Sequence, residues 1–213
     1  MKNTAAVLLL ALCLASPAFA QNTAAPAPAN QEQLAATLRD TRAAAERGDA
    51  HAQYKLGTMY SGGVPRDDVQ AVAWYRKAAE QGLAAAQSGL GFMYAAGRGV
   101  AQDDAQAVSW YRKAADQGDA HGQTNLGGMY LYGRGVAQDD AQAVAWYRKA
   151  AEQGFAGAQD YLGDMYAAGR GVARDDAQAV AWWRKAAEQG DPEAQYSLSE
   201  MEASKRGKQR QAR

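Results

Sequence analysis

The segment AVAWYRKAAEQG at residues 143–154 decides the fold, because it recurs along the chain. The same residues stand at 71–82, and near-copies stand at 107–118 (AVSWYRKAADQG) and 179–190 (AVAWWRKAAEQG). Each copy carries a tryptophan, and successive tryptophans are 36 residues apart: Trp74, Trp110, Trp146 and Trp182. A fixed period of this length is typical of repeat arrays, in which each unit packs mainly on its neighbours.

Both halves of each unit have the spacing of a helix with one apolar face. In one half, small and aromatic residues recur at intervals of three and four: Ala107, Trp110, Tyr111, Ala114 and Ala115. In the other half, Ala86, Leu90 and Tyr94 recur at intervals of four, and Gly91 permits close approach of a neighbouring helix. One such pair cannot bury both of its faces. The sequence therefore predicts an all-α fold of stacked antiparallel helix pairs.

Polar residues and glycines mark the ends of the predicted helices. An aspartate followed three residues later by glutamine precedes each second helix, as in a capping box: Asp67, Asp103, Asp139 and Asp175. A glycine suited to a left-handed helix end follows each of them: Gly82, Gly118, Gly154 and Gly190. Asp49, Asp119 and Asp191 are placed to cap first helices. Leu83 and Phe155 take this position elsewhere, which removes a cap worth about 1 kcal/mol.

These patterns divide the chain into successive segments. We expect a signal peptide at 1–20, a flexible linker at 21–30, an N-terminal capping helix at 31–48, repeats at 49–82, 83–118, 119–154 and 155–190, a C-terminal capping helix at 191–202 and a basic disordered tail at 203–213. Pro26 and Pro28 favour the linker. Asp40 stands where the capping helix would otherwise carry the tryptophan.

The first twenty residues have the features of an export signal. Lys2 is followed by an apolar stretch from Ala5 to Leu14 and by the small-residue cleavage motif Ala18-Phe19-Ala20. The stretch is shorter than the roughly 20 residues of a membrane-spanning helix, so we expect cleavage after Ala20 and no stable membrane insertion afterwards. The predicted location is the periplasm, and secretion is the alternative. Cys13 is the only cysteine and would be lost with the signal.

The charge balance excludes one class of function. The chain has 23 basic and 23 acidic residues, without the basic excess that nucleic-acid binding needs. Residues 21–202 alone carry 17 basic and 23 acidic side chains, while residues 203–213 hold five basic side chains and no acidic one. The basic tail could make weak contacts with anionic envelope components.

Residues suited to catalysis or metal binding are few, so we expect no catalytic residue, no metal and no cofactor. No serine is followed three residues later by lysine, which excludes one common acyl-enzyme motif. His51 and His121 lie two repeats apart, too far to share a metal ion. We interpret the aspartate pairs such as Asp67-Asp68 as helix caps, with cation binding as the alternative. The Gly97-Arg98-Gly99 loop lacks the lysine and strand of a phosphate-binding loop.

The unit Ala-x3-Leu-Gly-x2-Tyr, then Gly-x-Gly-Val, then Ala-x2-Trp-Tyr-x2-Ala-Ala-x2-Gly resembles the Sel1-like repeat, a relative of the tetratricopeptide repeat. The resemblance covers about residues 40–202. It implies a right-handed α-solenoid that binds other proteins, often as an adaptor in the bacterial envelope. Cysteine-rich relatives of this family bind or slowly hydrolyse β-lactams. This chain lacks their disulfides, so a β-lactam-binding or cell-wall hydrolase is the alternative function, and a secreted host-interaction factor is another.

The variation between units indicates where a partner would bind. The second helices are nearly identical, whereas one face of the first helices changes from unit to unit. In stacked helix pairs the first helices line the concave surface. We therefore predict that a protein or peptide binds a monomer of this chain at ten variable positions: Tyr54, Lys55, Thr58, Ser88, Phe92, Thr124, Asn125, Asp160, Tyr161 and Asp164. Tyr54, Phe92 and Tyr161 would be anchors, and Asp160 and Asp164 would select charge.

Overall fold

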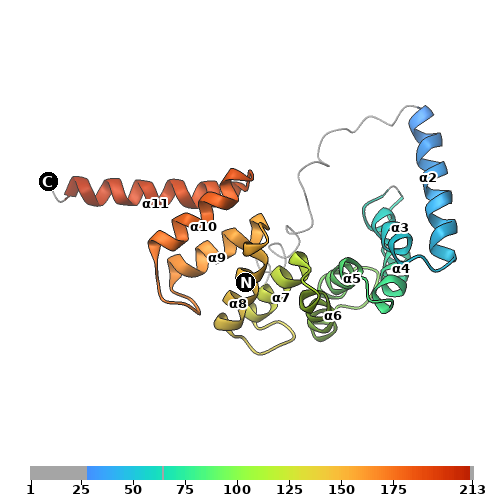
Figure 1. Ribbon diagram of the computed structural model, residues 1–213, viewed down its shortest axis with the longest axis horizontal. Coiled ribbons are helices and arrows are strands. Elements are labelled where there is room, and N and C mark those ends of the chain that lie inside the picture. The colour runs from blue at the N-terminus through green and yellow to red at the C-terminus, as the bar shows by residue number, and fades with distance from the viewer. Residues whose placement is uncertain (1–27, 64, 212–213) are drawn as a thin grey trace. The chain divides into compact units, whose positions relative to one another are not determined.

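The computed structural model describes residues 28–63 and 65–211, with side chains over 36–63 and 65–204, and this part of the chain is all-helical. Its ten helices appear in Figure 1: α2 (Pro28–Glu46), α3 (Ala50–Gly62), α4 (Asp68–Glu80), α5 (Ala84–Ala96), α6 (Asp104–Asp116), α7 (Ala120–Tyr132), α8 (Asp140–Glu152), α9 (Ala156–Ala168), α10 (Asp176–Glu188) and α11 (Pro192–Gln211). The described residues divide into two compact units on either side of the Gly122–Gln123 bond. The predicted signal peptide lies outside the described residues.

The predicted caps are confirmed. The Asp67 side chain accepts a hydrogen bond from the backbone N–H of Gln70 at 3.0 Å, and Asp103, Asp139 and Asp175 cap α6, α8 and α10 in the same way. Asp49, Asp119 and Asp191 accept from the first turns of α3, α7 and α11. Leu83 and Phe155 provide no such bond. Local polar chemistry therefore sets where each helix starts.

The core of each repeat consists of small residues around a few large aromatic rings. Alanines of the second helices are fully buried, among them Ala71, Ala78, Ala107, Ala114, Ala143 and Ala150. One leucine of each first helix is also fully buried: Leu56, Leu90, Leu126 and Leu162. Each second helix also places a lysine 3.9–4.0 Å from the ring centroid of its tryptophan, as Lys77 does with Trp74. The lysine stem and charge cover the ring on its outer side.

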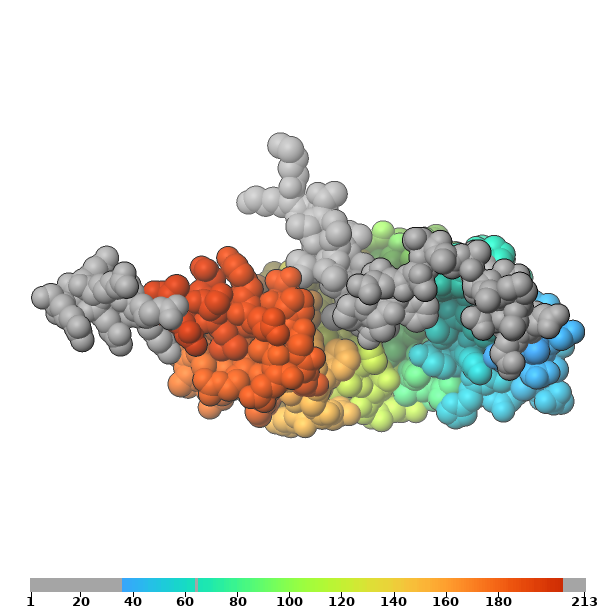
Figure 2. All heavy atoms as spheres, turned by 90° about the horizontal axis from the view of Figure 1, so that it is seen from above, coloured from blue at the N-terminus to red at the C-terminus, as the bar shows by residue number. Residues whose placement is uncertain are grey.

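The last repeat closes its core with α11. Ala179, Trp183 and Ala186 of α10 pack with Ala194 of α11, and Leu198 and Met201 lie against them. Figure 2 shows the described atoms of α10 and α11 (orange to red) as one continuous mass. This packing fixes the first turn of α11 on the end of the second unit.

A close approach between helices requires a glycine in each first helix, as Gly91 illustrates. A Cβ atom at Gly91 would lie 2.7 Å from the Tyr111 ring, which is fully buried. Gly57, Gly127 and Gly163 make the corresponding approach to Tyr75, Tyr147 and Trp183. The gain in contact between helices outweighs the roughly 1 kcal/mol that glycine costs inside a helix.

We expect Gly91→Ala to lower the free energy of unfolding by about 2 kcal/mol, because the added methyl group must displace a ring with no free space around it. Gly89→Ala is the matched control on the same helix. Its Cβ would meet the Tyr75 ring at 3.4 Å, an ordinary contact, so the better helix propensity of alanine should raise stability by up to about 1 kcal/mol. Urea unfolding followed by circular dichroism measures both. Equal effects of the two changes would contradict the close approach.

Glutamines form a ladder that joins successive helix pairs, and the sequence analysis did not single them out. Gln53 donates to the carbonyl oxygen of Ala45 at 3.0 Å, and its own carbonyl oxygen accepts from Gln81 at 2.7 Å. The same link between side chains occurs in the other repeats, from Gln117 to Gln87, from Gln153 to Gln123 and from Gln189 to Gln159. The first-helix glutamines are buried. Gln87 and Gln159 donate to Ala79 and Ala151 as Gln53 does to Ala45, so these three amides satisfy carbonyl oxygens at the end of the preceding second helix.

The two terminal helices extend further than the sequence analysis predicted. Helix α2 begins at Pro28, so the last residues of the predicted linker 21–30 are helical, while 21–27 lie outside the described residues. Helix α11 continues to Gln211, whereas a disordered tail was expected from 203 onwards. Proline is well accepted in the first turn of a helix. After Pro192 the segment contains no further proline and is rich in Lys, Arg, Gln, Glu and Ala, which all favour helix.

Candidate protein-binding surface

The ten predicted binding residues lie on four first helices, α3, α5, α7 and α9, but they differ in exposure. Lys55, Thr58 and Asp164 are exposed, and Tyr54 and Tyr161 are half-buried. The other five are buried: Ser88, Phe92, Thr124, Asn125 and Asp160. The accessible members therefore come from α3 in the first unit and α9 in the second.

Phe92 was predicted as an anchor, and its burial removes it from that role. Only 9% of its surface is exposed, and the Arg98 guanidinium lies 5.5 Å from the centroid of its ring. Ser88 is also occupied, since its hydroxyl donates to the Asp119 carboxylate. These side chains hold the first unit together, so their variation between repeats reflects packing as well as surface chemistry.

On α3 the accessible residues contact the ring of Tyr75 from the second helix of the same repeat. The Tyr54 and Tyr75 rings are tilted against each other with centroids 5.8 Å apart. The Tyr75 hydroxyl bonds the Thr58 and Ser61 hydroxyl oxygens at 3.3 and 3.1 Å. The structure therefore supports a preformed patch of two tyrosines and two hydroxyl side chains, with exposed Lys55 beside Tyr54 in the sequence.

On α9 the corresponding patch is aromatic and acidic. Tyr161 stacks on Tyr147 of α8 with ring centroids 5.0 Å apart. Trp183 of α10 takes the place of the tyrosine found in the other second helices, and its Nε1 donates to Asp164 at 3.1 Å. Protein atoms around the carboxylate displace water and raise the pKa of Asp164, although its side chain is exposed and the bond from Trp183 acts in the opposite direction.

Asp160 is the electrostatic exception in the second unit. It is only 8% exposed, and its Oδ1 atom is buried without a hydrogen-bond partner. Burial, together with the negative charges of Asp164, Asp191 and Glu193, raises the pKa of Asp160 to about 8. A carboxyl group with this pKa is mainly protonated at neutral pH. We call Asp160, Asp164, Asp191 and Glu193 the acidic cluster.

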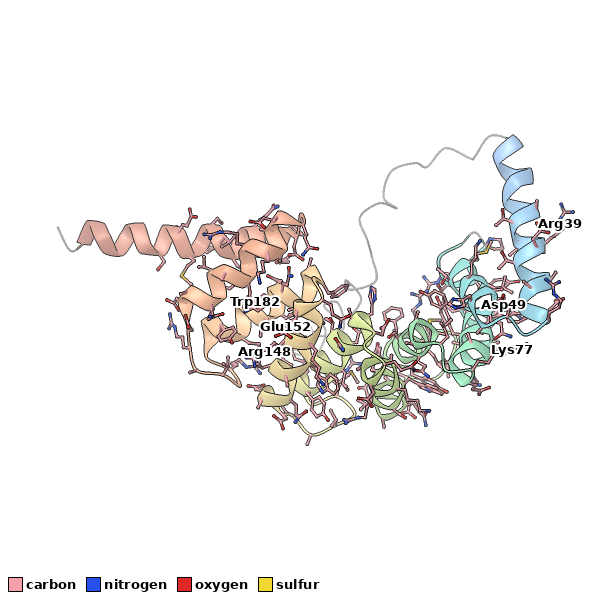
Figure 3. All side chains as sticks on the ribbon, viewed as in Figure 1. Arg39, Asp49, Lys77, Arg148, Glu152 and Trp182 are labelled. Atoms are coloured by element: carbon pink, nitrogen blue, oxygen red, sulfur yellow. The ribbon has the colours of Figure 1, made fainter. Side chains whose placement is uncertain are left out.

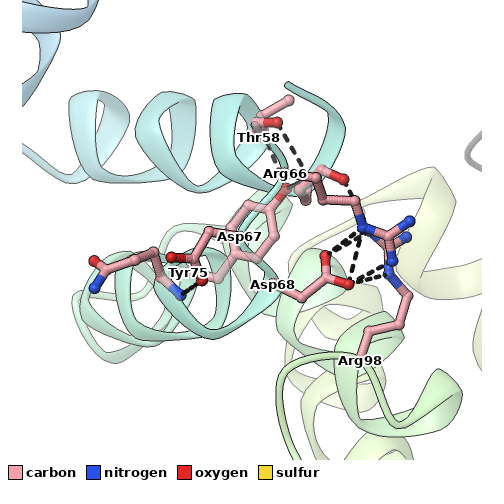
Figure 4. A network of polar contacts seen from close by, with 8 residues as sticks. Thr58, Arg66, Asp67, Asp68, Tyr75 and Arg98 are labelled. Carbon is pink, nitrogen blue, oxygen red and sulfur yellow. Dashed lines mark hydrogen bonds and ion pairs between the residues drawn. The ribbon is translucent and has the colours of Figure 1, made fainter. Parts of the chain in front are cut away.

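The Gly-Arg-Gly loop and the aspartate pairs, considered above for anion and cation binding, bind each other. Arg98 donates to both oxygens of Asp68, at 2.7 and 3.2 Å, and to the Ser61 carbonyl at 2.8 Å (Figure 4). Arg66 bonds the same carboxylate, and the two guanidinium groups lower the pKa of Asp68 to about 2. Arg170 and Asp140 form the same pair in the second unit, at 2.8 Å. Asp68 and Asp140, which follow the caps of α4 and α8, thus each fasten the loop of the next repeat.

Neither a metal site nor a membrane segment is found in the described part of the chain. Residues 28–63 and 65–211 contain no group of three or more His, Cys, Asp or Glu side chains placed to hold a metal ion. No helix within these ranges has both the length and the apolar character needed to cross a bilayer.

The helices form stacked antiparallel pairs, and the aspartates that cap the second helices recur every 36 residues. These features define a helical-repeat protein of the tetratricopeptide-related class. The Sel1 repeat model matches at residues 50–83, 84–119, 120–155 and 156–191, so the chain belongs to the Sel1 repeat family. Each matched segment begins one residue later than the corresponding repeat predicted in the sequence analysis. The predicted family and the predicted solenoid fold class are confirmed; the handedness of the solenoid stays a prediction.

Three solved structures illustrate the likeness. The antigen c5321 of uropathogenic Escherichia coli is 48% identical with a TM-score of 0.70, over 76% of this chain and 35% of that one. A Sel1 repeat protein of Oxalobacter formigenes is 38% identical with a TM-score of 0.72, over 76% of this chain and 65% of that one. Cysteine-rich protein B of Helicobacter pylori is 27% identical with a TM-score of 0.50, over 65% of this chain and 99% of that one.

The match spans about a third of the Escherichia coli antigen and just under two thirds of the Oxalobacter protein. Among curated protein sequences, none matches this chain significantly. The likeness therefore establishes the family and its scaffold-type repeat fold.

Proposed function

We propose that this protein is a non-enzymatic scaffold of the bacterial envelope, which binds a protein or peptide partner through the first helices of its repeats. The observation that carries the proposal is the contrast within the chain. Second helices are nearly copies of one another, whereas the accessible positions on α3 and α9 differ in ring, charge and hydroxyl content. Packing constrains the second helices, and a partner's surface is a sufficient reason for the differences on the first helices.

The proposed contact residues are those that remain accessible: Tyr54, Lys55 and Thr58 on α3, and Tyr161 and Asp164 on α9. Tyrosines held in place by neighbouring rings lose little side-chain freedom on binding, which favours them as anchors. The envelope location rests on the export signal expected at residues 1–20, and secretion is the alternative.

The test is capture of partners from an envelope extract by the mature protein and by a triple variant, Tyr54→Ala, Tyr161→Ala and Asp164→Ala. We expect the triple variant to lose at least about tenfold in captured partner, because it removes two aromatic anchors and one charge. The matched control is Glu152→Ala with Glu188→Ala, two exposed carboxylates on second helices; Glu152 is labelled on α8 in Figure 3.

The control should capture as much partner as the wild type, and the wild type, the triple variant and the control should have the same helical circular dichroism at the temperature of the capture. Equal capture by the triple variant would contradict binding through the first helices. Turnover of a chromogenic cephalosporin by the purified protein, above the level of a heat-inactivated sample, would contradict the non-enzymatic role and favour the β-lactam alternative.

A further inference from the structure

The acidic cluster brings carboxylates from two helices to one place in the second unit. Asp160 and Asp164 lie one turn apart on α9, Asp191 caps α11, and Glu193 lies in the first turn of α11. Every charged group that acts on Asp160 is acidic: Asp164 on its own helix, and Asp191 and Glu193 from the α11 end. Glu193 and Asp164 are exposed, so the cluster has an accessible outer part above the buried Asp160 carboxyl.

At the equivalent place in the first unit, both polar side chains have hydrogen-bond partners. Ser88 and Asp119 are separated by the same number of residues as Asp160 and Asp191. The Ser88 hydroxyl donates to the Asp119 carboxylate, which also caps α7, so both side chains are satisfied. In the second unit a carboxyl replaces that donor, and its buried Oδ1 has no partner. A buried oxygen without a donor is costly and calls for an explanation.

A group that satisfies the cluster must supply positive charge and several hydrogen-bond donors. A guanidinium group does both, because its planar fork of N–H groups can reach two carboxylates at once. An aromatic ring suited to such a group is present: Tyr196 is 64% exposed and follows Glu193 by three residues, which places both on one face of α11.

We propose that the acidic cluster binds an arginine side chain in a basic peptide segment of the partner. This inference rests on the proposed scaffold function and adds the chemistry that the partner presents to the second unit. Asp160 lies at the base of the site, Asp164 and Glu193 lie at its entrance, and Tyr196 is placed to cover the guanidinium plane.

The probe is the acetylated peptide GSGRRGSG. The control peptide carries citrulline, the neutral isostere of arginine, at both arginine positions. We follow backbone amide shifts of the labelled mature protein by NMR while each peptide is added up to about 5 mM. The arginine peptide should give saturable shifts at Asp160, Asp164, Asp191 and Glu193, and the citrulline peptide should give none. No saturable shift, or equal shifts with both peptides, would overturn the proposal.

Variants separate the site from the general acidity of the chain. Asp160→Asn and Asp160→Ser, the second of which copies the Ser88 arrangement, should weaken binding of the arginine peptide at least about tenfold, the effect of one lost charged contact. Glu152→Gln, which removes one exposed carboxylate from α8, should stay within about twofold. Equal losses of affinity in Asp160→Asn and Glu152→Gln would show that binding depends only on the acidity of the chain, which would overturn the proposed site.

Proton release provides a readout independent of affinity. Asp160 is mainly protonated at pH 7, and arginine binding requires its ionised form, so binding should release up to about one proton per peptide. Calorimetry in two buffers of different ionisation enthalpy measures this number, and affinity should rise from pH 6 to pH 9. Zero proton release would remove Asp160 from the site.

If the arginine peptide does not bind while the triple variant still loses partner capture, the scaffold stands and the arginine site is wrong. If partner capture is also unaffected by the triple variant, both proposals are wrong.

Discussion

Replacing Asp160 by asparagine should stabilise the protein by an amount on the order of 4 kcal/mol at pH 8, and by almost nothing near pH 4. In the native state burial and three neighbouring acids raise the pKa of Asp160 to about 8, against an ordinary value of 3.8. A group whose pKa is raised on folding contributes fully below its unfolded pKa and loses that contribution as pH rises through the native pKa. Each pKa unit is worth about 1.4 kcal/mol.

Asparagine has the shape of the carboxyl group, carries no charge and can donate to Asp191 as Ser88 does to Asp119. Urea unfolding at pH 4 and pH 8 measures the difference. Asp116→Asn, at an exposed carboxylate of α6, is the control and should change stability by less than about 0.5 kcal/mol at both pH values. A stability gain that does not depend on pH would show that the Asp160 carboxyl is not desolvated. A confirmed gain would mean that the chain retains a destabilising carboxylate, which is typical of binding sites.

Substituting Gly99 by alanine should lower the free energy of unfolding by more than about 3 kcal/mol, because the added methyl group would collide with backbone atoms. The residue has φ +66°, and a Cβ atom there would lie 2.1 Å from the carbonyl oxygen of Asp68 and 2.3 Å from its carbonyl carbon. Backbone atoms cannot turn aside as a flexible side chain can. The loop would have to move off the start of α4, and the pairing of Arg98 with Asp68 would be lost.

Gly82→Ala is the control that separates the backbone conformation from the close approach. Gly82 has φ +91°, but a Cβ atom there would meet nothing within 4 Å, so we expect only the cost of a left-handed residue, about 1 kcal/mol. Gly171→Ala repeats the test in the second unit, where the carbonyl oxygen of Asp140 lies 2.1 Å away. Urea unfolding compares the three variants. Equal losses at Gly99 and Gly82 would contradict tight docking of the loop.

Much of the fold could be predicted because it depends on local chemistry. The apolar spacing around Trp110 predicts a helix regardless of its neighbours, and Asp103 caps that helix with a backbone N–H only three residues away. The glycine ends and the missing caps at Leu83 and Phe155 follow from the same local rules. The Gln53–Gln81 link could not be predicted in this way, since it depends on which helix ends meet in space.

The candidate surface was only partly predictable, for a different reason. Variation between repeats identifies positions that the shared packing does not fix. It does not tell whether such a side chain contacts a binding partner or a neighbouring aromatic ring of the same chain. The Thr58 hydroxyl accepts from the Tyr75 hydroxyl and the Asp164 carboxylate accepts from Trp183 Nε1, so both positions also make contacts with the second helix beneath them. Asp160 was predicted as a residue that selects charge. Its burial near Asp191 could not be predicted, because it depends on how α9 and α11 meet in space.

The glutamine ladder makes the 36-residue unit an interchangeable cassette. The rungs that cross from one repeat to the next share one chemistry, because the first-helix glutamine donates to a carbonyl oxygen at the end of the preceding second helix, as Gln87 does to Ala79 and Gln159 does to Ala151. Duplication or deletion of one whole cassette by recombination leaves identical groups facing each other across the new junction, so the chain can change length without inventing a new interface. The exposed residues of a first helix such as α3 or α9 can change, and with them the partner that is bound, while the contacts between repeats stay the same.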